Sequence, residues 1–140
     1  MCNTDVDGMT CWASSQGMAE TTRRLRDAIA ENGMTLFAHV DHGRGAKEAA
    51  VELAPMEVFM FGSAAAGTRL MRTAPTAGID LPLRVLVWVD EDGGTWLGYN
   101  EPSWIAARHH ARSGNDQVLA AMRGLLRSIA EQVTGLGAGS

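Results

Sequence analysis

The chain has 140 residues, of which 46% are hydrophobic, and a formal net charge of −4 at neutral pH. This length suits one globular domain with a single buried core and leaves no room for a second domain. The acidic charge argues against a nucleic-acid scaffold, because such proteins need a basic face to displace counterions from phosphates.

No membrane segment or export signal is expected. The opening residues, MCNTDVDGMT, lack a basic region followed by a continuous apolar stretch. No apolar run approaches the roughly 20 residues that span a bilayer. Cys2 and Cys11 lie outside any C-x-x-C pair, so reduced thiols and a cytoplasmic location are expected.

Strands and helices alternate in the first half of the chain. In order, the expected elements are a strand over 9–13, a helix that ends at Gly33, a strand over 35–41, a helix over 46–54 and a strand over 56–62. Ser14 or Ser15 can cap the first helix, whose apolar residues fall on one stripe. Pro55 stops the second helix.

A hairpin and three helices are predicted in the second half. The expected elements are a helix over 68–74, strands over 83–90 and 95–100, and helices over 102–112 and about 116–134. The sequence EDGG between the two strands is typical of a hairpin turn. From Val118 to Val133 the last helix carries an apolar stripe, which should lie across the sheet.

These elements indicate an α+β fold: a single antiparallel sheet of about five strands with helices packed against it, plus a C-terminal amphipathic helix. The antiparallel hairpin favours this class over a doubly wound parallel sheet. The domain is expected over residues 9–112, with a helical extension and tail over 113–140.

The segment FAHVDHGRGA, residues 37 to 46, contains two histidines and an aspartate close together. Side chains alternate along a strand, so His39 and Asp41 share one face while His42 lies on the other. The two histidines could not chelate one ion without a local bend. A pair of His39 with Asp41 is more plausible, and the carboxylate would then stabilise the protonated imidazole.

His109 and His110 are expected on a helix, where adjacent side chains diverge by about 100 degrees, so at most one faces inward. If His42 and His109 met in space, they could form a polar pocket, bind a small anion, or ligate iron or zinc with a third group. Histidines that cap turns or lie at the surface are the alternative reading.

The segment GSAAAGT, Gly62 to Thr68, follows a strand, opens a helix and has the glycine spacing of a phosphate-binding loop. It lacks the lysine that such loops place on the terminal phosphates, which argues against nucleotide hydrolysis. Free amides at the helix start, with Thr68, Arg69 and Arg72 nearby, could still hold a carboxylate or phosphate. A tight strand-to-helix turn is the alternative.

Three segments carry a family resemblance: FAHVDHGRGA, ELAPMEVFMFGSAAAGTRLM and GIDLPLRVLVWVDEDGGTWLGYNEPSWIAARH. Together they resemble the Domain of Unknown Function 302 family over about residues 9–110. The most specific set is Asp80-Leu81-Pro82 followed by Tyr99-Asn100 and Pro102. The resemblance implies a small α+β domain, similar to the TATA-binding-protein-like fold and often paired as dimers. It confers no established activity.

The resemblance also implies which positions match the family motif. They are Asp41, His42, Gly62, Gly67, Thr68, Asp80 to Pro82, Asn100, Pro102 and His109. His39 and His110 lie outside this set. The family's usual Asn-Pro after the glycine is replaced here by Ser63-Ala64, and the helix from Asn115 extends beyond the common domain.

The leading hypothesis is a non-catalytic homodimeric domain that binds a small ligand, with an anion as one candidate. The expected ligand-binding residues are Asp41, His42, Thr68, Asp80, Asn100 and His109. One alternative is an enzyme in which His42 or His109 is a general base oriented by a carboxylate, either Asp41 or Asp80.

Two further alternatives are a haem or metal carrier with histidine ligands, and association through the exposed face of the last helix. No particular cofactor is indicated, and neither nucleic acid nor membrane is expected as a partner.

Overall fold

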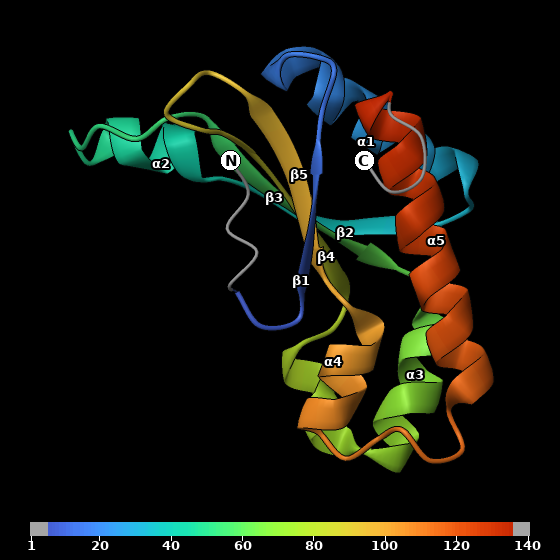
Figure 1. The fold of residues 1–140 in the computed structure, drawn as a ribbon. Helices are drawn as coiled ribbons and strands as arrows, with labels where there is room; N and C mark the ends of the chain where they lie inside the picture. Colours follow the sequence, from blue (N-terminus) through green and yellow to red (C-terminus); the bar gives the residue numbers. More distant parts are fainter. Residues whose placement is uncertain (1–5, 136–140) are drawn as a thin grey trace.

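The structure, a computed structural model, describes residues 6–135. It consists of one antiparallel sheet with helices packed mainly on one side (Figure 1). The strand order in the five-stranded sheet is β1-β5-β4-β3-β2, so β1 and β2 are the edge strands. The predicted α+β class, with one antiparallel sheet and a C-terminal helix, is confirmed.

The strands lie within one residue of the predicted ranges. They are β1 (Met9–Ala13), β2 (Thr35–Asp41), β3 (Met56–Gly62), β4 (Leu83–Val89) and β5 (Thr95–Asn100). The helices are α1 (Met18–Glu31), α2 (His42–Glu48), α3 (Ala64–Thr73), α4 (Pro102–Arg108) and α5 (Asp116–Thr134), with a short 3-10 helix η1 (Pro75–Ile79).

The two short helices α2 and α3 begin earlier than predicted. The Asp41 carboxylate accepts a hydrogen bond from the Arg44 backbone N–H at 2.8 Å, so Asp41 is the N-cap and α2 starts at His42 instead of residue 46. α3 begins at Ala64 instead of Thr68. Gly67 therefore lies inside the helix and is not its entry point.

The helices α1 and α4 also differ at their ends. Gly17 is the N-cap of α1, rather than Ser14 or Ser15, and its carbonyl accepts from the Thr21 N–H. α4 stops at Arg108, ahead of the predicted 112. The backbone of His110 has a φ of 54°, a left-handed conformation that an α-helix cannot continue through.

The main hydrophobic core lies between one face of the sheet and the helices α1 and α5. The sheet contributes Phe59, Phe61, Val85, Val87, Leu97 and Tyr99, all at most 4% exposed. α5 contributes Met122, Leu126, Ile129, Ala130 and Val133 to the same core. α5 is therefore a layer of the domain itself.

Different helices adjoin the two ends of the sheet. Leu36, Phe61 and Leu83 are cross-strand neighbours at the end where α3 and η1 pack. Asp41 pairs with Glu57 five residues further along, at the end from which α2 emerges. At about 3.4 Å per residue the two ends are roughly 17 Å apart. This separation determines which polar residues can meet.

Cys11 is disulfide-bonded, which corrects the expectation of a reduced thiol. The chain's other cysteine, Cys2, lies outside the described residues. Disulfides are typical of oxidising compartments, so this bond does not support the cytoplasmic location expected from the sequence.

Within residues 6–135, no helix has both the length and the apolar character needed to cross a bilayer.

Candidate functional site

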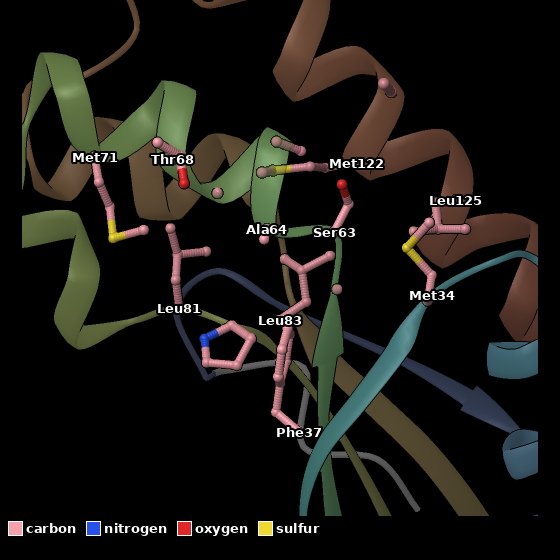
Figure 2. A pocket seen from close by; sticks show the side chains of 15 residues that line it. Met34, Phe37, Ser63, Ala64, Thr68, Met71, Leu81, Leu83, Met122 and Leu125 are labelled. Atoms are coloured by element: carbon pink, nitrogen blue, oxygen red, sulfur yellow. The ribbon is translucent and has the colours of Figure 1, made fainter.

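A cavity of about 590 Å³ lies where β3 turns into α3 (Figure 2). Its walls come from the start of β2, the β3–α3 turn, the segment 81–83 and α5. The lining residues are Met34, Phe37, Gly62, Ser63, Ala64, Ala66, Gly67, Thr68, Met71, Leu81, Pro82, Leu83, Ala121, Met122 and Leu125. Among these, Ser63 and Thr68 alone have polar side chains, and none is charged.

Small residues at the start of α3 create this cavity. The turn and first helical residues read GSAAAG, so short side chains stand where longer ones would fill the space. A Cβ on Gly67 would lie 3.8 Å from Met71 Cε and 3.9 Å from Leu81 Cδ1, which is ordinary contact. The segment that resembles a phosphate-binding loop is therefore one wall of an apolar cavity.

Figure 2 shows the side chains that surround the cavity. Met71 and Leu81 lie on one side of it, and Met34 and Leu125 lie on the other. Phe37 is 52% exposed at a bulge in β2. Methionine side chains are flexible and polarisable, so they adapt to apolar ligands of different shapes.

A polar cluster joins η1 to the end of α4. His109 Nε2 lies 2.5 Å from an Asp80 carboxylate oxygen, and His109 Nδ1 lies 2.9 Å from the Thr76 hydroxyl. Arg108 donates to both oxygens of Asp80, at 3.0 and 2.8 Å. The side chains of His109 and Asp80 are only 8% and 14% exposed. Leu81, the neighbour of Asp80, lines the apolar cavity.

The cluster keeps Asp80 ionised. Burial by itself would raise the pKa of Asp80, but hydrogen bonds from His109 and Arg108 outweigh this and lower that pKa below its ordinary value. An ionised carboxylate against one nitrogen and a hydroxyl against the other orient the imidazole. A chain of hydroxyl, imidazole and carboxylate has the geometry that proton transfer needs.

The structure brings together some of the predicted site residues. Asp80 and His109 are in direct contact, and Thr68 lines the neighbouring cavity. Asn100 ends β5, where it pairs with Met9 of β1. It is not among the residues that line the cavity.

His42 and His109 are not brought together, which corrects the expectation of a pocket shared between them. His42 is exposed at the first residue of α2, and Asp41 caps that helix. Asp41 is the last residue of β2 and His42 follows it, at the end of the sheet opposite to Asp80. The length of the strands separates the two groups.

His39 pairs with a carboxylate other than Asp41. Its Nε2 lies 2.6 Å from Glu57 Oε1, its ring stacks on Phe59 at 4.6 Å, and Arg26 Nη2 lies 3.1 Å from its Nδ1. Glu57 comes from the adjacent strand β3, so no local sequence pattern indicates the pair. The expected partner Asp41 caps α2 instead.

The geometry supports neither a metal site built from histidines nor an anion site that includes Arg69 and Arg72. Among residues 6–135, no group of three or more His, Cys, Asp or Glu side chains is placed to hold a metal ion. Arg69 and Arg72 are exposed on α3 and line a separate surface depression with the start of α5. They do not line the apolar cavity.

A family model described as "Domain of unknown function DUF302" matches residues 11–129. The chain belongs to this family. The DUF302 match runs into α5, in keeping with the place of that helix in the core. A crystal structure of an uncharacterized conserved DUF302 protein from Bacillus stearothermophilus has the same fold, with a TM-score of 0.81. It is 17% identical, over 91% of this chain and 99% of that chain.

The DUF302 chain is also similar to curated bacterial proteins. It is 42% identical over 115 residues to Fluoride-specific ion channel FluC 1 of Brucella suis, which covers 82% of this chain and 45% of that protein. The same identity holds for FluC 2 of Brucella melitensis, over 43% of its length. This chain thus spans less than half the length of these relatives.

Proposed function

We propose that this DUF302 domain binds a small, predominantly apolar molecule in the cavity at the β3–α3 turn. The observation that supports this most strongly is the lining, which has fifteen residues and no charged side chain. Sites for small molecules are typically apolar concavities of about 300–1,000 Å³ with a few polar groups. The volume of about 590 Å³ falls within that range.

An anion is a poor fit for this cavity. A charged ligand would lose its hydration there and gain no cation, which costs several kcal/mol or more. The hydroxyls of Ser63 and Thr68 can each donate and accept hydrogen bonds. The ligand class considered from the sequence is therefore revised to a neutral molecule with an apolar body and at most a few polar atoms.

Primary alcohols from hexanol to dodecanol test the proposal. Burial of each added methylene contributes about 0.8 kcal/mol, so we expect the dissociation constant to fall about fourfold per carbon until the cavity is full. Isothermal titration calorimetry measures this series directly. A dissociation constant that does not depend on chain length would contradict an apolar site.

A matched pair of tryptophan variants locates the binding. Ala121 is exposed and lines the cavity, so Ala121→Trp should obstruct it and weaken decanol binding at least tenfold. Ala120 is also exposed on α5 but does not line the cavity. Ala120→Trp should leave affinity unchanged. Equal affinity in the two variants would place the alcohol elsewhere.

A second candidate function follows from the Brucella relatives. Those proteins are named as fluoride-specific ion channels, and the similar segment is less than half of each. No helix in the described part of this chain could cross a membrane, so the pore of the relatives is expected in their remaining part. We propose that this domain associates with such a channel, and that ligand binding in the cavity changes the rate of ion conduction.

Removal of the matched segment from the Brucella suis protein tests this second candidate. We expect fluoride efflux from proteoliposomes, followed with a fluoride electrode, to persist in the truncated protein. Decanol should change the efflux rate of the full protein and leave that of the truncated one unchanged. Loss of all efflux on truncation, with the protein still inserted, would instead place the segment within the pore structure.

A further inference from the structure

A polar pocket separate from the apolar cavity lies between the edge strand β1 and the helix α5. Its volume is about 240 Å³. The side chains that give it its chemistry come from β1, from the end of β5 with the residue after it, and from α5: Thr10, Tyr99, Glu101, Arg123 and Arg127. Thr10 and Tyr99 are cross-strand neighbours. We call this hollow the arginine pocket. It shares no residue with the apolar cavity.

The arginine pocket contains a buried hydroxyl whose proton has no acceptor in the described part of the chain. Tyr99 is 4% exposed, and its hydroxyl oxygen accepts a hydrogen bond from Trp12 Nε1 at 3.3 Å. Among residues 6–135, no oxygen or nitrogen atom accepts the proton of this hydroxyl in return. A buried donor without a partner is costly. An oxygen atom of a ligand in the pocket would provide that partner.

Two arginines from α5 make one side of this pocket positive. Arg123 and Arg127 are four positions apart, so they share a face of the helix. Burial raises the pKa of Tyr99, and the charges of both arginines oppose that rise. Arg127 lies 3.6 Å from Glu131 in an exposed ion pair, whereas Arg123 pairs with no carboxylate of the described residues. This side of the pocket therefore offers two cations and a neutral phenol donor.

A carboxylate lies at the same pocket, and the arginines do not neutralise it. The Thr10 hydroxyl donates to Glu101 Oε2 at 2.7 Å. The negative charge of Glu101 raises the pKa of Tyr99, so it too acts on the hydroxyl. In the described structure, neither Arg123 nor Arg127 forms an ion pair with Glu101. Opposite charges that line one pocket without meeting leave room between them for a ligand that carries both signs.

We propose that the arginine pocket binds the charged head of a small α-amino acid. The carboxylate of the ligand accepts hydrogen bonds from the arginines of α5 and from the Tyr99 hydroxyl, and its ammonium group donates to Glu101. Guanidinium groups bind carboxylates through two parallel hydrogen bonds. The pocket volume lies below the about 300–1,000 Å³ of sites for larger molecules, which agrees with a small ligand.

The charge pattern favours a zwitterion over an ion of one sign. A simple carboxylate would face the negative charge of Glu101, and a simple amine would face Arg123 and Arg127. Like charges brought together at a binding site are strongly unfavourable. An amino acid avoids both contacts, because its two charges match the two sides of the pocket.

Thermal-shift measurements with each of the twenty common L-amino acids test the proposal and identify the ligand. At least one of them should raise the melting temperature of the full chain. Isothermal titration calorimetry then compares that amino acid with its analogue without the amino group and its analogue without the carboxylate. Each analogue should bind at least tenfold more weakly, because each loses a charge-assisted hydrogen bond.

Variants that remove one charge locate the site. Arg123→Gln should weaken binding of the amino acid at least tenfold. Arg112→Gln removes the same charge at an exposed position outside the pocket and should leave the affinity unchanged. Glu101→Gln should weaken binding of the amino acid but not that of its analogue without the amino group.

Three results would overturn the proposal. They are an unchanged melting temperature with all twenty amino acids, equal affinity for the amino acid and for its analogue without the amino group, and equal affinity of the Arg112→Gln and Arg123→Gln variants. Decanol binding should be the same in Arg123→Gln and in the unaltered protein, because the two sites share no residue. Failure of one site is therefore distinguishable from failure of the other.

Discussion

Termination of the chain at residue 114 is expected to unfold the domain. α5 contributes Met122, Leu126, Ile129, Ala130 and Val133 to the main core, all at most 5% exposed. Loss of a buried Leu or Ile side chain alone costs about 2–5 kcal/mol, and whole domains have about 5–15 kcal/mol of stability. Circular dichroism of the truncated protein should therefore lack the native helical signal and show no cooperative melting.

Substitutions at two adjacent positions of α5 provide the control. Leu126 is 1% exposed, and Leu126→Ala should lower the free energy of unfolding by about 3 kcal/mol. Arg127 makes a surface ion pair with Glu131 at 3.6 Å, so Arg127→Ala should cost less than about 1 kcal/mol. A truncated protein that melts cooperatively near the temperature of the full chain would show that α5 is an appended segment.

Asp80→Asn is expected to destabilise the protein at neutral pH and to have less effect in acid. The change removes charge-assisted hydrogen bonds to His109 and Arg108, each worth about 1.5–3 kcal/mol. We expect a total loss of about 2–4 kcal/mol at pH 7. Urea unfolding at several pH values measures this.

The direction of the pH dependence follows from the pKa of Asp80. This pKa is lower in the folded protein than in the unfolded chain, so the ionised carboxylate stabilises the fold fully above the unfolded pKa of about 3.9. That stabilisation is lost as the pH falls through the lower pKa of the folded state. The difference between the variant and the unaltered protein should therefore narrow below about pH 4.

Glu48→Gln is the matched control, because it makes the same chemical change at an exposed site. Glu48 is 72% exposed and lies 3.7 Å from Arg44. Its replacement should change stability by less than about 1 kcal/mol at any pH. If Asp80→Asn costs as much at pH 3 as at pH 7, its effect does not arise from the ionised carboxylate.

The sequence predicted part of the candidate site. Asp80, His109 and Thr68 belong to the motif positions, and all three lie in or beside the described site. Thr76 and Arg108 are not indicated, because nothing in their local sequence shows that Thr76 meets His109 or that Arg108 meets Asp80. A run of small residues after a strand, followed by methionine and leucine, is the signal that could have indicated an apolar cavity.

Local patterns along the chain are enough to predict the strands, the hairpin and the last helix. Those features depend on residues close together in the chain, such as the alternation along β4 or the apolar stripe of α5. The contact of Asp80 with His109, 29 positions away, and the separation of His42 from both arise only when the strands pack together. The register and length of the strands set the distances between these side chains. That register depends in turn on how every strand packs against α1 and α5.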